Sequence, residues 1–230
     1  MTQITNNQTS HNKLYWVSSN IIADYFPPIE TALSDPDGLL AIGGDLTPDR
    51  LINAYSTGIF PWYSKGQPVL WWSPDPRCIL IPDEIQISKS LNRTLKKGVF
   101  EVTFNQSFQT IINKCAQPRN GNPDTWITEE IIEAYSKLEL MGKIISVETW
   151  HKREIVGGLY GVSIGKVFFG ESMFSNMNDA SKIALVKLSS RLIDKGYKLI
   201  DCQIFSKHLQ SLGAKTVPRK LFSDMLKQLC

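Results

Sequence analysis

The 230-residue sequence has no uninterrupted apolar run near the roughly 18 residues that a membrane-spanning helix needs. Its first stretch, MTQITNNQTSHNK, is polar and lacks the apolar core of a secretory signal. We therefore expect a cytoplasmic protein with no membrane segment.

Cysteine and histidine are scarce and scattered. The four cysteines, at positions 78, 115, 202 and 230, form no CxxC pair, and the three histidines form no HxxxH pair. These spacings favour reduced thiols over a zinc site or a disulfide framework. We expect neither a metal nor a cofactor.

The net charge is also low: the chain has 25 basic and 22 acidic residues, which gives +3 at pH 7. That excess does not identify a nucleic-acid-binding protein, so the distribution of charge must decide. Lys89, Arg93 and Lys97 recur every four residues, with Lys96 beside them and no acidic residue between. On a helix they form one basic stripe, which is either a solvated face or a surface that contacts phosphates.

The composition is that of a folded protein, with 42% hydrophobic and 10% aromatic residues. The stretch from about Phe26 to Arg77 is rich in Pro, Gly and Trp. Within it, Thr47 and Pro48 predict the start of a helix that ends near Gly58. Beyond Pro76, helix and strand patterns alternate. We predict a small N-terminal domain at 1–76 and a larger mixed α/β domain at 77–230.

The larger part has predicted helices at 88–97, 107–117, 128–141, 179–195, 207–212 and 219–229. Strands are predicted at 99–104, 144–150, 154–164, 166–174, 198–204 and 215–217. Short turns join the three strands between 144 and 174, which predicts an antiparallel meander.

Two polar side chains lie in an otherwise apolar predicted strand, LIDCQIF. Alternation places Asp201 and Gln203 on one face and Cys202 on the other. A buried acid needs a specific partner, so the pair is either a structural polar network or a ligand site, and we favour the ligand site. Glu171, in GESMFS, lies where another strand ends.

Three of the six tryptophans, Trp62, Trp71 and Trp72, surround a predicted turn at Lys65 and Gly66. Such residues either pack between two domains or form platforms on which nucleic-acid bases stack. The sequence leaves both interpretations open.

Longer motifs resemble one family, the bacterial leucyl/phenylalanyl-tRNA-protein transferases. They run from FPP and DGLLAIGGDLTPDRLINAYSTGIFPWYSKGQPVLWWSPDPR through TWIT, GGLYG and GESMFS to LIDCQ and HLQSLGA. The resemblance implies transfer of Leu or Phe, less readily Met, from aminoacyl-tRNA to proteins that begin with Arg or Lys. The product is a destabilising N-terminus for proteolysis. The resemblance also implies a small N-terminal domain and a larger domain similar to the GCN5-related N-acetyltransferase fold. We expect the protein to be a monomer.

The same resemblance assigns roles to residues of this chain. Asp201 would hold or help deprotonate the attacking amine, Gln203 would orient it, and Glu171 would support both. Substrate-binding positions are Trp62 and Trp126, near the terminal adenosine, together with Tyr55, Tyr135, Leu159, Met173, Leu185, Leu188 and Ser206. With tRNA as the donor, we expect the basic stripe described above, Lys89, Arg93, Lys96 and Lys97, to contact its phosphates. Leu159 and Ser206 stand where the family commonly has Met and Asn, so fine substrate preference can differ.

Two other functions compete with this one. An acyl-CoA-dependent N-acetyltransferase would need an R/Q-x-x-G-x-G/A loop before a helix. The nearest candidate helix start, SNMNDASK at 175–182, contains no glycine. A non-catalytic RNA-binding module would use the basic stripe and tryptophans but leave Asp201 and Gln203 unexplained.

Overall fold

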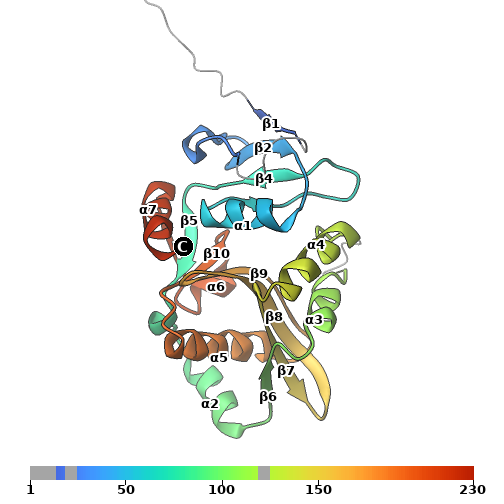
Figure 1. Ribbon diagram of the computed structural model, residues 1–230. Helices are drawn as coiled ribbons and strands as arrows, with labels where there is room; N and C mark the ends of the chain where they lie inside the picture. Colours follow the sequence, from blue (N-terminus) through green and yellow to red (C-terminus); the bar gives the residue numbers. More distant parts are fainter. Residues whose placement is uncertain (1–13, 19–24, 119–124) are drawn as a thin grey trace, which may run out of the picture.

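The structure is a computed structural model that describes residues 14–18, 25–118 and 125–230. Within these residues the chain forms two sheets (Figure 1). The smaller sheet has the order β1-β2-β4-β3 and the larger has the order β11-β5-β10-β9-β8-β7-β6. The predicted mixed α/β class is confirmed.

The smaller sheet consists of β1 (Tyr15–Val17), β2 (Leu39–Gly43), β3 (Phe60–Pro61) and β4 (Leu70–Trp72). Helix α1 (Pro48–Ser56) starts directly after Thr47, as predicted, and lies between the two sheets in Figure 1. The Trp71 indole is fully buried and donates from Nε1 to the Gly43 carbonyl at 2.8 Å. Trp71 is thus a packing residue of this small sheet.

The larger sheet consists of β5 (Arg77–Leu80), β6 (Glu101–Phe104), β7 (Ile144–His151), β8 (Glu154–Ile164), β9 (Val167–Ser175), β10 (Leu199–Gln203) and β11 (Lys215–Val217). The antiparallel meander β7-β8-β9 is confirmed, and β10 then pairs in parallel with β9. Strand β5 was not predicted, because its four residues are buried without alternation and follow a proline-rich segment. The small sheet ends at Trp72 and the large one begins at Arg77, while the division into domains after residue 76 stays a prediction.

Helices cover both faces of the larger sheet. They are α2 (Lys89–Lys97), α3 (Phe108–Cys115), α4 (Glu129–Leu140), α5 (Ala180–Asp194), α6 (Lys207–Gln210) and α7 (Arg219–Leu229), with short 3₁₀ helices at Ile29–Thr31 and Pro82–Glu84. One buried cluster joins α1, α3, α4 and α7 to the sheet, and a second joins α2 and α5 to the opposite face. Because both faces are covered, the strands of the sheet centre are buried on both sides.

Two β-bulges interrupt neighbouring strands at the same level. Glu171 is the extra residue of β9 between the pairs Gly161–Gly170 and Tyr160–Ser172. Cys202 is the extra residue of β10 between the pairs Asp201–Ile79 and Gln203–Cys78. Since β9 and β10 pair only as far as Phe169 and Asp201, the two strands part there, and the bulges re-aim the side chains that follow.

Gly161 explains how the β9 bulge can form. A Cβ atom at this position would lie 2.1 Å from the Phe169 carbonyl oxygen and 2.5 Å from the Phe168 ring. The last glycine of the GGLYG motif, Gly161, is therefore required because the backbone and the ring of the neighbouring strand approach it closely.

Candidate active site

A cavity of about 370 Å³ opens where β9 and β10 part. Most of its lining is apolar: Phe60, Pro61, Trp62, Trp126, Leu159, Tyr160, Phe168, Met173, Leu185, Ile200, Ile204 and Leu209. Its polar members are Glu171, Ser172, Cys202, Gln203, Ser206 and His208. An apolar cavity with a few convergent polar groups is the usual form of a small-ligand or side-chain pocket.

A hydrogen-bonded chain forms the polar end of this cavity. Gln203 donates from Nε2 to Glu171 Oε1 at 2.9 Å, and the Tyr135 hydroxyl donates to Glu171 Oε2 at 2.8 Å. The hydroxyls of Tyr135 and Tyr55 are also hydrogen-bonded to each other. Both carboxylate oxygens of Glu171 are thus occupied, which fixes its orientation toward Gln203.

Glu171 is half-buried at the polar end of the cavity. Burial raises its pKa from 4.5 to about 7, and the negative charge of Asp201 adds to that rise. Hydrogen bonds from tyrosine and Gln203 favour the ionised form and offset part of the effect. Glu171 therefore changes charge near neutral pH.

Asp201 lies behind the cavity rather than in it. Its side chain is 0% exposed and pairs in a bidentate manner with Arg77, whose Nε lies 2.9 Å from Oδ1 and whose Nη2 lies 2.7 Å from Oδ2. Asp201 Oδ1 also accepts the backbone N–H of Gln203 at 2.9 Å. The buried acid has the specific partner that the sequence required, but that partner is an arginine of β5.

The expected alternation along β10 is wrong. Cys202, expected on the opposite layer, lines the cavity beside Gln203, whereas Asp201 does not line it. The cause is the bulge at Cys202, after which Gln203 adopts a left-handed backbone with φ of 59°. One extra residue in a strand reverses the faces of all that follow.

Six of the nine residues predicted to bind substrate line the cavity: Trp62, Trp126, Leu159, Met173, Leu185 and Ser206. Leu188, one turn further along α5, is fully buried in the core and is not among the lining residues. Tyr55 and Tyr135 are also 0% exposed and stand behind Glu171. Neither tyrosine reaches the cavity surface, and both act on Glu171 instead.

Several lining residues were missed in the sequence, among them Phe60, Phe168, Ile200, Ile204, His208 and Leu209. Phe60 immediately precedes the Pro61–Trp62 pair, and Phe168 and Ile200 are opposite each other in the β9–β10 register. That pairing between distant strands is the signal that would have found them. His208 follows the LIDCQ motif closely, and partial burial together with the charge of Lys182 lowers its pKa.

The four basic residues of α2 lie on an exposed helix face around a shallow hollow that Asn92 shares. None of them lines the cavity. Helix α2 begins at the Ser88 cap and ends at the left-handed Gly98, as the sequence indicated.

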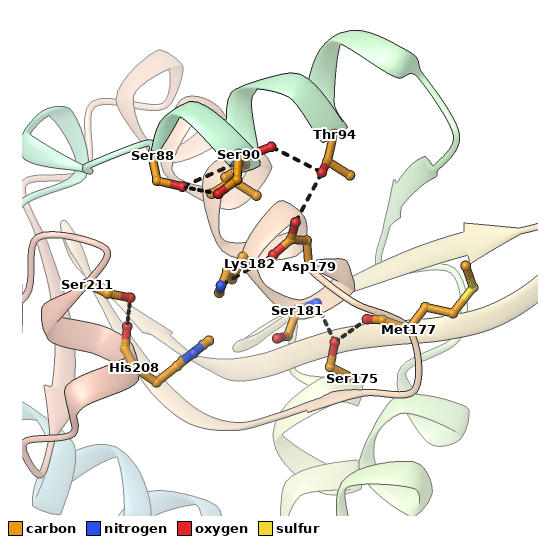
Figure 2. A network of polar contacts seen from close by, with 11 residues as sticks. Ser88, Ser90, Thr94, Ser175, Met177, Asp179, Ser181, Lys182, His208 and Ser211 are labelled. Atoms are coloured by element: carbon orange, nitrogen blue, oxygen red, sulfur yellow. Dashed lines mark hydrogen bonds and ion pairs between the residues drawn. The ribbon is translucent and has the colours of Figure 1, made fainter.

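The start of α5 is closed by side chains (Figure 2). Ser175 Oγ accepts the Ser181 N–H at 3.2 Å, while the Asp179 carboxylate accepts the Thr94 hydroxyl at 3.1 Å and pairs with Lys182 at 3.3 Å. A carboxylate and a capped amide at this place disfavour a pyrophosphate, which needs free backbone N–H groups. The start of α5 is therefore poorly suited to bind the pyrophosphate of acetyl-CoA.

Two absences concern residues 14–18, 25–118 and 125–230 alone. No group of three or more His, Cys, Asp and Glu side chains there is placed to hold a metal ion. None of the helices in the same residues combines the length and the apolar character needed to cross a membrane.

The chain was next compared with known proteins. The family described as "Leucyl/phenylalanyl-tRNA protein transferase" matches residues 79–227, and the one described as its N-terminal domain matches residues 44–75. The leucyl/phenylalanyl-tRNA--protein transferase of Nitrosospira multiformis is 53% identical over 214 residues, which is 93% of this chain and 91% of that protein. The one of Nitrosomonas europaea is 55% identical, covering 89% of this chain and 86% of that protein. The one of Pseudomonas aeruginosa is 53% identical, covering 88% and 90%.

A solved structure named "GCN5-related N-acetyltransferase from Kribbella flavida" is similar to this chain with a TM-score of 0.41 and 10% identity, over 74% of this chain and 60% of that one.

The three relatives, each more than 50% identical over most of this chain, are all named as transferases, and the chain is accordingly a group-transfer enzyme. The family matches then specify which: the chain belongs to the leucyl/phenylalanyl-tRNA protein transferase family.

Proposed function

We propose that this protein transfers Leu or Phe, and less readily Met, from aminoacyl-tRNA to the N-terminal Arg or Lys of other proteins. The observation that carries the proposal is the Gln203 side chain, held by Glu171 at the polar end of an apolar cavity. Family membership supports the donor and the acceptor class. The product would carry a destabilising N-terminus.

The bond to be cleaved is an ester that is already activated, so the enzyme has chiefly to align the reactants. The neutral α-amine of the acceptor attacks the ester carbonyl carbon, an amide bond forms, and the bond to the ribose oxygen breaks. The amine proton passes to the leaving ribose oxygen, directly or through water. No covalent enzyme intermediate is needed.

The amide of Gln203 suits the task of orienting the amine. Because its Nε2 donates to Glu171, its Oε1 is turned the other way and is available to accept an N–H of the acceptor amine. Glu171 supports this orientation, and Tyr55 and Tyr135 support Glu171. Asp201 acts through the backbone of Gln203 rather than on the amine itself.

The apolar part of the cavity would select the donor side chain. Leu159, Met173 and Leu185 come from three different elements and converge on it. We expect this cavity to accept Leu, Phe and Met, whose side chains are not branched at Cβ. Val and Ile, which are branched there, would crowd its entrance and differ from Leu by shape alone. Discrimination by shape is partial.

Trp62 and Trp126 are proposed to hold the terminal adenosine that all donors share. Trp62 is 42% exposed at the cavity edge, and its backbone is fixed by the Trp72 indole, which donates to the Trp62 carbonyl at 2.7 Å. An exposed aromatic face on a fixed backbone is suited to stacking on a base. The α2 stripe would contact tRNA phosphates further from the reacting atoms.

We further propose that the protein acts as a monomer in the cytoplasm, where its charged tRNA substrates are made. One chain supplies both walls of the cavity, from β3 and from the larger sheet. No second copy is needed to complete the site.

One assay tests the proposal against its two rivals. A peptide that begins with Arg is mixed with labelled Leu-tRNA or, separately, with labelled acetyl-CoA, and the label on the peptide is measured. We expect Leu transfer and no acetyl transfer. Acetyl transfer would support an acetyltransferase, and binding of tRNA without any transfer would support a non-catalytic module.

A further inference from the structure

The backbone of Gln203 needs to be held in place. Its φ of 59° lies in the left-handed region, which residues other than Gly, Asn and Asp rarely adopt, and it directly follows the β10 bulge. Its N–H donates to Asp201 Oδ1, and the next N–H, of Ile204, turns back to the Cys202 carbonyl at 2.7 Å. The direction of the Gln203 side chain thus depends on where the Asp201 carboxylate lies.

Asp201 is in turn held by Arg77. The two parallel hydrogen bonds, at 2.9 and 2.7 Å, fix both the plane and the rotation of the carboxylate. Since both side chains are essentially unexposed, water cannot replace the arginine as a partner. Without Arg77, Asp201 would be a buried, unpaired charge and would take up a proton or rotate away.

Arg77 is itself fixed from two directions. Its guanidinium carbon lies 4.7 Å from the centre of the Phe60 ring and 4.8 Å from that of Phe222. Phe60 belongs to the small sheet and lines the cavity, whereas Phe222 belongs to α7. Arg77 thus ties a cavity wall, the last helix and the carboxylate behind Gln203 into one packed unit.

We propose that Arg77 is a positioning residue for the transfer reaction, acting through Asp201 on the backbone of Gln203. It touches no substrate, because it is 0% exposed and does not line the cavity. The inference rests on the proposed function, in which Gln203 orients the acceptor amine.

The first test replaces the ion pair with apolar side chains of comparable size, Arg77→Met with Asp201→Leu. Buried ion pairs replaced in this way often leave stability unchanged, so the variant keeps a folded core while losing the anchor for Gln203. We expect kcat for Leu transfer to fall at least ~100-fold, close to the loss from Gln203→Ala, with KM for Leu-tRNA within about twofold of the wild type. Unchanged kcat in the folded variant would overturn the proposal.

A coupling measurement separates positioning from a purely structural role. In a chain that already carries Gln203→Ala, the same double substitution should lower kcat by less than about threefold, because the side chain that it positions is gone. If the combined variant instead lost kcat by the product of the two separate factors, for the double substitution and for Gln203→Ala, Arg77 would act independently of Gln203 and the proposal would be wrong.

Arg77→Lys serves if the double substitution prevents folding. Lysine keeps the charge but cannot make the two-point contact, so we expect kcat to fall at least ~10-fold without loss of fold. The matched control is Arg50→Lys, since Arg50 is equally buried and pairs with Asp45 in the small sheet region, at 3.3 Å. Arg50→Lys should leave kcat within about twofold. Equal kcat losses in the two variants would contradict the proposal.

A measurement without turnover distinguishes this inference from the proposed function. The side-chain amide resonance of Gln203, assigned by its loss in Gln203→Ala, should shift in Arg77→Lys and stay in place in Arg50→Lys. An inactive wild type with that shift would overturn the proposed function but leave the positioning intact. An unshifted resonance would overturn the positioning.

Discussion

Glu171 and Gln203 are joined by a 2.9 Å hydrogen bond across the gap where β9 and β10 part. Glu171 is the extra residue of the β9 bulge, and Gln203 directly follows the β10 bulge at Cys202. These two local irregularities bring together side chains that regular strands would have kept apart. The polar end of the cavity depends on this contact.

Gln203→Ala should therefore reduce turnover much more than it reduces stability. We expect kcat to fall ~100-fold or more, because an orienting group at the reacting centre is removed, while the melting temperature stays within a few degrees. Initial rates with Leu-tRNA and a peptide that begins with Arg measure kcat, and thermal unfolding measures the melting temperature. Gln210→Ala, on exposed α6, is the control and should change neither. Full activity of Gln203→Ala would make the Glu171 contact structural.

Glu171 should make stability depend on pH in a defined direction. Because its folded pKa, about 7, lies above the ordinary 4.5, its contribution to stability is complete below pH 4.5 and is lost as pH rises to about 7. Relative to Glu171→Gln, the wild type should lose up to about 3 kcal/mol of unfolding free energy across that range. Urea unfolding of both proteins at pH 5, 6, 7 and 8 checks this. A difference that is constant with pH, or that grows in favour of the wild type, would contradict it.

The α2 stripe should act on tRNA and not on chemistry. Replacing Lys89, Arg93, Lys96 and Lys97 by Ala should raise the KM for aminoacyl-tRNA and flatten its dependence on salt, because fewer phosphates are neutralised. An aminoacyl-adenosine donor without the tRNA body should be affected much less. The control is Lys220→Ala with Lys227→Ala, two exposed lysines on α7. Equal losses with both donors would remove the phosphate assignment.

Met173 and Trp126 line the same cavity but should affect the donor in different ways. Met173→Ala reshapes the apolar part and should change the ratio of Leu to Phe transfer. Trp126→Ala should lower transfer of both by similar factors, because stacking on a shared adenosine contributes ~1 to 3 kcal/mol whatever the side chain. Initial rates with both charged tRNAs measure the ratio. If Trp126→Ala shifts the ratio and Met173→Ala does not, the two roles are reversed.

Local signals in the sequence predicted most elements of the fold. Helix α1 could be placed because Thr47 and Pro48 mark its start, and the β7-β8-β9 meander because its turns are short. Bulges have no such local signal, and for that reason the alternation drawn through Cys202 put Asp201 on the cavity face. Arg77 was missed for a related reason. Its partner is 124 positions away, and the strand that carries it has no alternating pattern.

The composition of the cavity wall limits how the chain can be divided. Phe60, Pro61 and Trp62 come from β3 and its edge, while Glu171 and Gln203 come from the larger sheet. A fragment that starts at residue 77 would contain Glu171 and Gln203 but would lack Phe60, Pro61 and Trp62 of the cavity lining. Conversely, a chimaera that exchanges residues 44–75 with those of a relative would bring in a foreign wall opposite an unchanged catalytic strand. The three residues proposed to select the donor side chain, Leu159, Met173 and Leu185, lie in β8, β9 and α5 and would stay with that strand. Such an exchange should therefore alter the contact proposed between Trp62 and the shared adenosine, while the ratio of Leu to Phe transfer stays close to that of the parent.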